Sequence, residues 1–293
     1  MGKMDNLEFV DLREELEKNH IAWDSPACCS SKESSYSLLR AQMQGTFQFS
    51  REGVWIKDFE HDKKCLSLLH LAKQKSCDLV LFPEYCISDQ VLWDIVSDEA
   101  LWPENRKLWV LPCQGMTKDQ FQAFIENLSK NNRVFLLDTA CTSRRVTFNH
   151  FVTVLFYCFL GYQGDASILC LVPQLKTQPM GDQDCLCEQA GMATGSVVFT
   201  LEQRLLTLLC ADSMNNELTW QRLQEEGLLM SGLTILHPQL NGHPKDQVFS
   251  RLRWELFERG TPGVYITCNW AAGTTLSSPD YLEAAYTIDL SGA

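Results

Sequence analysis

The sequence lacks the features that mark a membrane-spanning or secreted protein. Its longest apolar run, FVTVLFYCFL over residues 151–160, is far too short to cross a bilayer. The first twenty residues are rich in acidic side chains and contain no apolar core, so they do not resemble a secretory signal. Asn6 stands where a myristoylation signal needs Ser or Thr. We therefore expect a cytoplasmic protein with no membrane partner.

Positive charge is also scarce. The 293 residues include 37 Asp and Glu against 25 Lys and Arg, which gives a net charge of −12. An acidic balance disfavours general affinity for nucleic acid or for an anionic membrane surface. Nothing in the chain resembles a polymerase or nucleotide-binding motif. We expect no direct binding to nucleic acid.

The 13 cysteines include no CxxC pair. The CC at Cys28 and Cys29 and the CLC at 185–187 lack zinc-ligand spacing and a suitably placed histidine, so no metal site is predicted. Cys158 and Cys170 lie inside apolar runs, as small buried thiols do. Free thiols in a reducing cytosol are the expectation, and a disulfide framework is not.

The chain divides at a small polar linker, SPACCSSKESS over residues 25–35. Residues 1–34 are predicted to be an N-terminal extension, with an amphipathic helix over 6–19 that carries Phe9, Leu12 and Leu16 on one side. This helix either docks on the core or recruits a partner. Residues 35–293 are predicted to form the main domain, with a short C-terminal edge after Asn269 and a closing strand over 286–290.

Helical and strand patterns alternate along this main domain, and hairpins fill its middle. This order predicts an α/β fold with sheets inside and helices outside. The predicted helices are 62–76, 118–132, 218–227 and 246–260. The predicted single strands are 36–43, 78–82, 133–140, 233–238 and 263–269. Two hairpins are also predicted, one of two long strands that meet near Gly161 to Gly164 and one with its tip at Glu202 and Gln203. Residues 85–109 are predicted to be a specificity loop, in which Trp93 and Trp102 either line a pocket or pack.

Three buried strands end in residues with reactive side chains. Glu84 follows the strand DLVLF, Lys176 follows the second long hairpin strand, and Cys210 follows LLTLL. Reactive groups in open α/β sheets gather beyond the carboxyl ends of the strands. A thiol can attack as a nucleophile, a carboxylate can take its proton, and an ammonium can stabilise an oxyanion. Taken singly, each residue is just as well a surface charge or a small buried thiol.

The order and context of these residues resemble the nitrilase (carbon–nitrogen hydrolase) superfamily. The resemblance rests on Glu84 in CDLVLFPEY, Lys176 in VPQLKTQ, and Cys210 with Asp212 in LLTLLCAD. It also includes Asn149 in TFNHFVTVLFY, Glu188 in CEQAGMATGSVVF, and Asn269 after the strand GVYITC, and it spans from Ser37 to the end of the chain.

This resemblance implies a four-layer α-β-β-α sandwich and a Glu84–Lys176–Cys210 triad, supported by Glu188, Asn149 and Asp212. It implies hydrolysis of a small-molecule amide, or less readily a nitrile, through a thioester on Cys210 with no cofactor. It also implies a homo-oligomer, and Leu223, Leu228, Leu229 and Met230 are candidate interface residues unless they pack on the sheet. The alternative is a binding or sensor module without turnover in a larger assembly, such as a bacterial defence protein.

Overall fold

Two β-sheets form the centre of the computed structural model, which describes residues 7–30, 35–50, 53–128, 130–137, 151–178, 196–230, 232–243 and 245–277. The first sheet has the spatial order β2 (Leu38–Arg40), β5 (Leu79–Leu81), β6 (Leu108–Pro112), β10 (Val154–Gln163), β11 (Ala166–Leu175) and β8 (Val134–Leu136). The second has the order β1 (Leu7–Asp11), β12 (Ser196–Leu201), β13 (Leu205–Thr207), β14 (Leu233–Gln239) and β15 (Gly263–Asn269).

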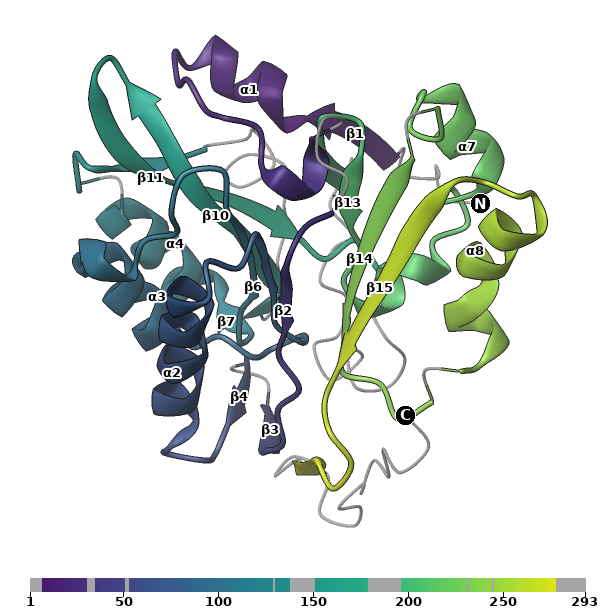
Figure 1. The fold of residues 1–293 in the computed structure, drawn as a ribbon. Coiled ribbons are helices and arrows are strands. Elements are labelled where there is room, and N and C mark those ends of the chain that lie inside the picture. The colour runs from purple at the N-terminus through teal and green to yellow at the C-terminus, as the bar shows by residue number, and fades with distance from the viewer. Residues whose placement is uncertain are drawn as a thin grey trace.

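Helices cover the outer faces of both sheets (Figure 1). The first sheet is covered by α2 (His61–Gln74), α3 (Asp89–Ser97) and α4 (Lys118–Leu128), and the second by α7 (Trp220–Glu225) and α8 (Gln247–Glu258). Smaller elements are β3 (Thr46–Ser50), β4 (Gly53–Ile56), β7 (Met116–Thr117), β9 (Phe151–Val152), β16 (Thr275–Ser277), α1 (Leu12–Lys18) and 3₁₀ turns at Ala27–Cys29, Glu99–Leu101 and Cys210–Met214. The fold is of the predicted α/β class, with sheets inside and helices outside.

Side-chain alternation along the strands divides the core into separate layers. In β5 and the segment after it, Val80 and Phe82 face the helices, whereas Leu79 and Leu81 face the second sheet. The same alternation runs along β10, since Phe156 belongs to the helix side. Both faces of these strands are buried, which explains why they read as continuous apolar runs rather than as alternating sequences.

The segment over residues 6–19 is only partly the predicted helix. Residues 7–11 form β1, which pairs in parallel with β12, and the helix α1 begins at Leu12. Leu7 packs on the helix side of the second sheet and Val10 on the side between the sheets, which is a strand pattern of period two. Asp11 ends the strand, because its side chain accepts a hydrogen bond from the Arg13 amide and caps α1.

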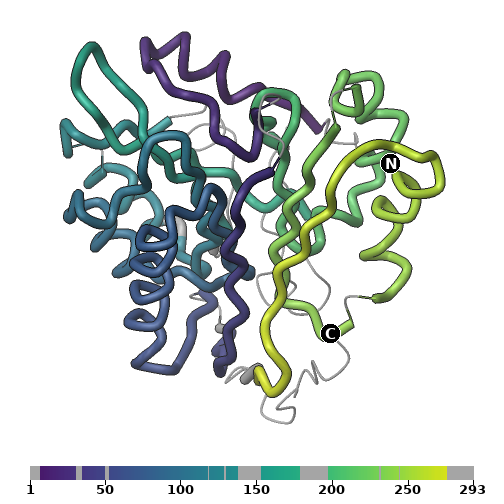
Figure 2. Tube along the Cα trace, viewed as in Figure 1, coloured from purple at the N-terminus to yellow at the C-terminus, as the bar shows by residue number. Residues whose placement is uncertain are grey.

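The N-terminal segment crosses one end of both sheets (Figure 2). After α1, whose Leu12 and Leu16 are buried between the sheets, Ala22 exchanges two backbone hydrogen bonds with Tyr162 of β10. Residues 7–30 therefore dock on the core, which is one of the two expected alternatives for this segment. The predicted boundary at residue 34 remains a prediction.

Residues 85–109 are not a loop, contrary to the prediction. Ser88 caps α3 by accepting a hydrogen bond from the Val91 amide, and β6 begins at Leu108. Trp102 is buried and donates its indole N–H to the Ile95 carbonyl, while Trp93 packs edge-on against Phe124. Both tryptophans therefore pack in the helix layer.

Among the described residues, no helix is both long and apolar enough to cross a membrane.

The other predicted elements agree with the structure to within a few residues at their ends. The helices become α2, α4, α7 and α8, and the long hairpin becomes β10 and β11, which pair from Val154 with Leu175 to Gln163 with Ala166. The pair with its tip at Glu202 and Gln203 becomes β12 and β13. The predicted closing strand over 286–290 lies outside the described residues.

Candidate active site

Glu84, Lys176 and Cys210 meet where strands from both sheets end. Glu84 follows β5, Lys176 follows β11, and Cys210 begins the 3₁₀ turn after β13. The Lys176 Nζ lies 3.0 Å from the Glu84 Oε1, and their side chains are only 7% and 1% exposed. The Cys210 thiol is fully buried, its Sγ lies 3.9 Å from the Leu240 carbonyl oxygen, and it feels the charges of both Glu84 and Lys176. The structure thus brings together the three side chains that the sequence placed at separate strand ends.

Glu84 is held from two directions. Its Oε2 accepts a hydrogen bond from the Leu240 amide (3.1 Å), and its own carbonyl accepts one from the Trp270 indole N–H (2.8 Å). Leu240 follows β14 and Trp270 follows β15, so the second sheet fixes a residue that belongs to the first. The next residue, Tyr85, has φ +59°, a left-handed conformation that turns the chain sharply after the carboxylate.

Lys176 is positioned by the hairpin that precedes it. Its backbone amide donates to the Thr153 carbonyl (2.9 Å), and its Nζ lies 5.9 Å from the centre of the Tyr85 ring. The Tyr85 hydroxyl is in turn hydrogen-bonded to the Thr153 hydroxyl. A lysine with a flexible stem is thereby confined between an aromatic face and a carboxylate, both of which favour its positive charge.

Cys210 occupies a strained turn. Its φ is +41°, and a non-glycine residue in this region costs on the order of 1–3 kcal/mol unless its surroundings enforce it. Burial, first of all, and the negative charge of Glu84 raise the pKa of the Cys210 thiol well above its ordinary value, whereas the charge of Lys176 lowers it. Cys210 is thus a protonated thiol next to a carboxylate, and a thiol in such a setting becomes a strong nucleophile only when a neighbouring base takes its proton.

Asp212 ties the cysteine turn to the lysine strand. Its Oδ1 accepts hydrogen bonds from the Thr177 amide, the Thr177 hydroxyl and the Gln178 amide, and its Oδ2 accepts one from the Leu209 amide. Burial raises the pKa of Asp212 to about 6, although the charge of Lys176 and these hydrogen bonds oppose that shift. The carboxylate therefore acts as a structural brace that fixes Lys176 relative to Cys210.

His237 enforces the strained backbone of Cys210, a role that the sequence did not reveal. It lies in β14, fully buried, with its Nε2 2.8 Å from the Cys210 carbonyl oxygen. A carbonyl only accepts, so Nε2 carries the ring proton, and Nδ1 accepts from the Tyr265 hydroxyl (2.9 Å). Burial lowers the pKa of His237 to about 4, which keeps the ring neutral at pH 7.

Gln174 links the two sheets beneath the site, and sequence reasoning missed it too. Its Nε2 donates to the Thr207 carbonyl of β13, and its Oε1 accepts from the Phe199 amide of β12 and from the Tyr157 hydroxyl. Gln174 precedes Lys176 by two residues, and Thr207 precedes Cys210 by three. A single buried amide therefore sets the separation of the two strand ends that carry the lysine and the cysteine.

Two predicted supporting residues, Asn149 and Glu188, lie outside the described residues. Asn269, which the resemblance also included, holds the segment after β14, because its side chain is hydrogen-bonded to both the amide and the carbonyl of Asn241. Cys28 and Cys29 are buried neighbours with sulfurs 3.9 Å apart. The ten cysteines of the described residues are all free thiols.

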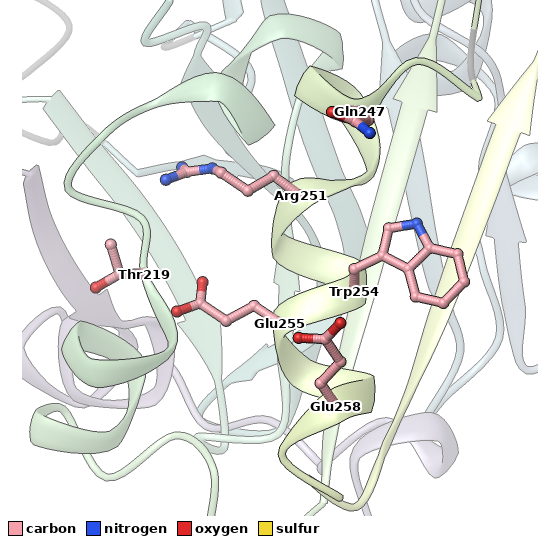
Figure 3. A pocket seen from close by; sticks show the side chains of 6 residues that line it. All are labelled: Thr219, Gln247, Arg251, Trp254, Glu255 and Glu258. Carbon is pink, nitrogen blue, oxygen red and sulfur yellow. The ribbon is translucent and has the colours of Figure 1, made fainter.

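A surface pocket lies between α7 and α8 (Figure 3). Its lining contains none of the Glu84, Lys176 and Cys210 side chains. Arg251 reaches across it to donate to the carbonyls of Asn215 and Leu218, in the segment after the cysteine turn. This arginine therefore braces α8 against that segment, and the pocket is separate from the candidate active site.

The structure was compared with known proteins. It matches an amidase from Nesterenkonia sp. at 13% identity and a TM-score of 0.39, over 83% of this chain and 81% of that one. A double mutant of the amidase from Nesterenkonia sp. AN1 in complex with acrylamide matches at 11% identity and a TM-score of 0.36, over 84% and 80%. A further mutant, described as a Nesterenkonia AN1 amidase from the nitrilase superfamily, matches at 12% and 0.34, over 80% and 79%.

The chain is similar to amidases of the nitrilase superfamily. No family model and no curated protein matches the chain. The roles of the individual residues consequently rest on the geometry of this chain alone.

Proposed function

We propose that the protein hydrolyses a carbon–nitrogen bond of a small amide, with Cys210 as nucleophile, Glu84 as general base and acid, and Lys176 as oxyanion stabiliser. The observation that carries this proposal is the buried Lys176–Glu84 ion pair (3.0 Å) next to a fully buried thiol. Burying two charges is costly, and a buried pair of ionisable groups beside a reactive thiol is a functional-site candidate on physical grounds.

In the proposed reaction, the Cys210 sulfur bonds to the carbonyl carbon while its proton passes to Glu84. The carbonyl oxygen gains the negative charge, which the Lys176 ammonium faces. The C–N bond then breaks as Glu84 returns the proton to the departing nitrogen, leaving a thioester. A water that gives its proton to Glu84 attacks the thioester, and the thiol is regenerated as the acid product leaves.

The test is a panel of simple amides, ureas and nitriles assayed for release of ammonia or amine. We expect wild-type protein to hydrolyse at least one amide, and Cys210→Ala to remove that activity with a loss of stability on the order of 1 kcal/mol. Cys113→Ala is the matched control, because Cys113 is equally buried but lies in the helix layer. Full activity of Cys210→Ala on a cleaved amide would refute the assignment of the nucleophile.

The second candidate function is a binding or sensor module without turnover. Complete burial of Cys210 favours it, since a buried thiol with a raised pKa is a poor nucleophile unless the substrate and base activate it. A haloacetamide probe distinguishes the two functions. Rapid labelling of Cys210 relative to the other cysteines supports the hydrolase, and labelling of Cys77 (the one half-exposed cysteine of the described residues) ahead of Cys210 supports the binding module.

We also propose that the protein forms a homo-oligomer, but through a different surface from the one suggested by the sequence. Leu223, Leu228 and Leu229 are buried on the second sheet, which leaves Met230 as the exposed member of that group. Exposed apolar side chains gather instead on α8, where Trp254 is 54% and Phe257 74% exposed. Light scattering at micromolar concentration checks this, and the mass of one chain would refute it.

A further inference from the structure

A second cluster of reactive side chains lies beneath the candidate active site. His61 and Cys65 lie on the first two turns of α2, and Cys86 lies in the segment that follows β5. All three are buried, with exposures of 1% or less. Their potential ligand atoms lie within 4.8 Å of one another, and no other group of three or more His, Cys, Asp or Glu residues in the part of the chain that the structure describes meets that condition.

The local structure explains why these side chains converge. Residues four apart in a helix share one face, so His61 and Cys65 both point from α2 toward the sheet. The left-handed turn at Tyr85 directs the chain back beneath the helix and places Cys86 against that face. The His61 ring also stacks on Trp270, whose indole holds the Glu84 carbonyl.

The spacing of the three atoms is that of ligands around a single ion. The sulfurs of Cys65 and Cys86 are 3.9 Å apart, and the His61 Nε2 lies 3.4 Å from the first and 3.7 Å from the second. With a Zn–S bond of about 2.3 Å and a Zn–N bond of about 2.0 Å, two ligands at a tetrahedral angle are about 3.8 Å apart for two sulfurs and about 3.5 Å apart for a sulfur and a nitrogen. The observed separations match these values.

Charge and donor type identify the ion. Two thiolates and a neutral imidazole carry a charge of −2, and a divalent cation makes the assembly neutral, as a fully buried site requires. Thiolate and imidazole donors together favour zinc over magnesium, calcium or manganese. The His61 Nε2 donates a hydrogen bond to the Cys86 carbonyl oxygen (2.6 Å) in this structure, so binding of the ion moves the ring proton to Nδ1 and releases the protons of the two thiols.

We propose that His61, Cys65 and Cys86 bind one Zn²⁺ ion with a structural role. The ion would connect the start of α2 to the segment two residues beyond Glu84. It would stabilise the turn that presents this carboxylate without contacting a substrate. The inference does not depend on the hydrolase function, because metal binding is measured on the protein itself.

The experiment measures metal content by mass spectrometry of the full chain, expressed with zinc and dialysed against a weak chelator to strip loosely held ions. We expect about one zinc per chain in wild type and in the control Cys113→Ala, and a loss of at least tenfold in Cys65→Ala. X-ray absorption at the zinc edge of the wild type provides a second measurement that needs no variant. It should show two sulfur neighbours, with the remaining neighbours nitrogen or oxygen.

Several results would overturn the proposal. These are wild-type protein that contains no zinc under these conditions, Cys65→Ala that keeps a full equivalent, or a zinc shell without two sulfurs. Freshly purified wild type with a Cys65–Cys86 disulfide and no metal would also overturn it, and would show that the paired sulfurs serve oxidation instead. Zinc present together with no activity on any amide would uphold this inference while the proposed hydrolase function fails.

Discussion

Removing Lys176 tests whether the buried ion pair is a functional feature or a stabilising one. In Lys176→Met the Glu84 carboxylate, 1% exposed, loses the ammonium that lies 3.0 Å from its Oε1. The Leu240 amide still donates to the Glu84 Oε2 in this variant. Methionine matches the length of the lysine stem, so the change removes charge and keeps most of the packing.

The expected loss of stability is large. At 3.0 Å and an effective dielectric constant of 20, the attraction between two unit charges is about 5–6 kcal/mol. Removing one partner of a buried pair costs about 3–5 kcal/mol, because the other charge is left uncompensated. Lys107→Met is the matched control. Its pair with Asp78 is similarly short, 2.6 Å, but the two side chains are 19% and 18% exposed, so we expect a loss of about 1 kcal/mol.

The decisive variant is the double substitution Lys176→Met with Glu84→Gln. Since neither member of the pair is then charged, we expect the double variant to recover most of the stability lost in Lys176→Met, as measured by urea unfolding followed by circular dichroism. Activity should be absent from both single variants and from the double variant. If the two single losses simply add in the double variant, the charges are not coupled and the proposed geometry of the site is wrong.

Three further predictions concern the groups that hold the site. His237→Gln keeps a donor for the Cys210 carbonyl but removes a ring whose pKa is lowered from 6.5 to about 4 by burial. At low pH only the wild-type protein must bury a charge at this position. The free energy of unfolding of the wild type should therefore fall by about 3 kcal/mol relative to that of the variant between pH 6.5 and pH 4, and the difference should stay level above pH 7. A pH-independent difference would show that His237 is not buried in its neutral form. Gln174→Leu leaves the buried Phe199 amide without its acceptor, so we expect urea unfolding to show a loss of about 1–3 kcal/mol in the free energy of unfolding. An unchanged free energy of unfolding would show that Gln174 does not link the two sheets. Gly161→Ala would place a Cβ 2.6 Å from the Cys170 sulfur and 2.9 Å from the Ile21 side chain, which would push the N-terminal segment away from β10. Limited proteolysis should therefore cut the N-terminal segment faster in the variant than in wild type. Unchanged protection from proteolysis would contradict the docking of this segment on β10.

Much of the fold could be predicted from the sequence, because long amphipathic helices and apolar strands carry strong periodic signals. The errors have local causes. β1 was predicted to be part of a helix because Phe9, Leu12 and Leu16 fit a helical spacing. Its pairing with β12, nearly two hundred residues later in the chain, cannot be inferred from the local sequence around residues 7–11. The helix α3 was taken as a loop, although Ser88 and the apolar residues after it form a normal helix start.

The candidate site could be predicted from the sequence only for its three reactive side chains. Glu84, Lys176 and Cys210 interrupt apolar runs, so their positions stand out in the sequence. The groups that position these side chains do not stand out in the sequence. The Leu240 amide is a backbone donor, and His237 and Gln174 lie inside apolar strands. The zinc-ligand spacing was also hidden, since His61 and Cys65 form a pair on α2 while Cys86 is separated from them by a whole strand.

Under the proposed mechanism, the shared position of the three groups explains how a raised thiol pKa is compatible with catalysis. At rest the Lys176 charge is paired with Glu84, and Cys210 is neutral, so these three groups together carry no net charge. When the thiol proton passes to Glu84, that carboxyl loses its charge and its attraction for the ammonium. The negative charge moves at the same step to the substrate oxygen, where Lys176 can stabilise it. The net charge of the three groups and the substrate is therefore zero before and after attack, and burial, which penalises a free thiolate, favours the concerted transfer over prior ionisation.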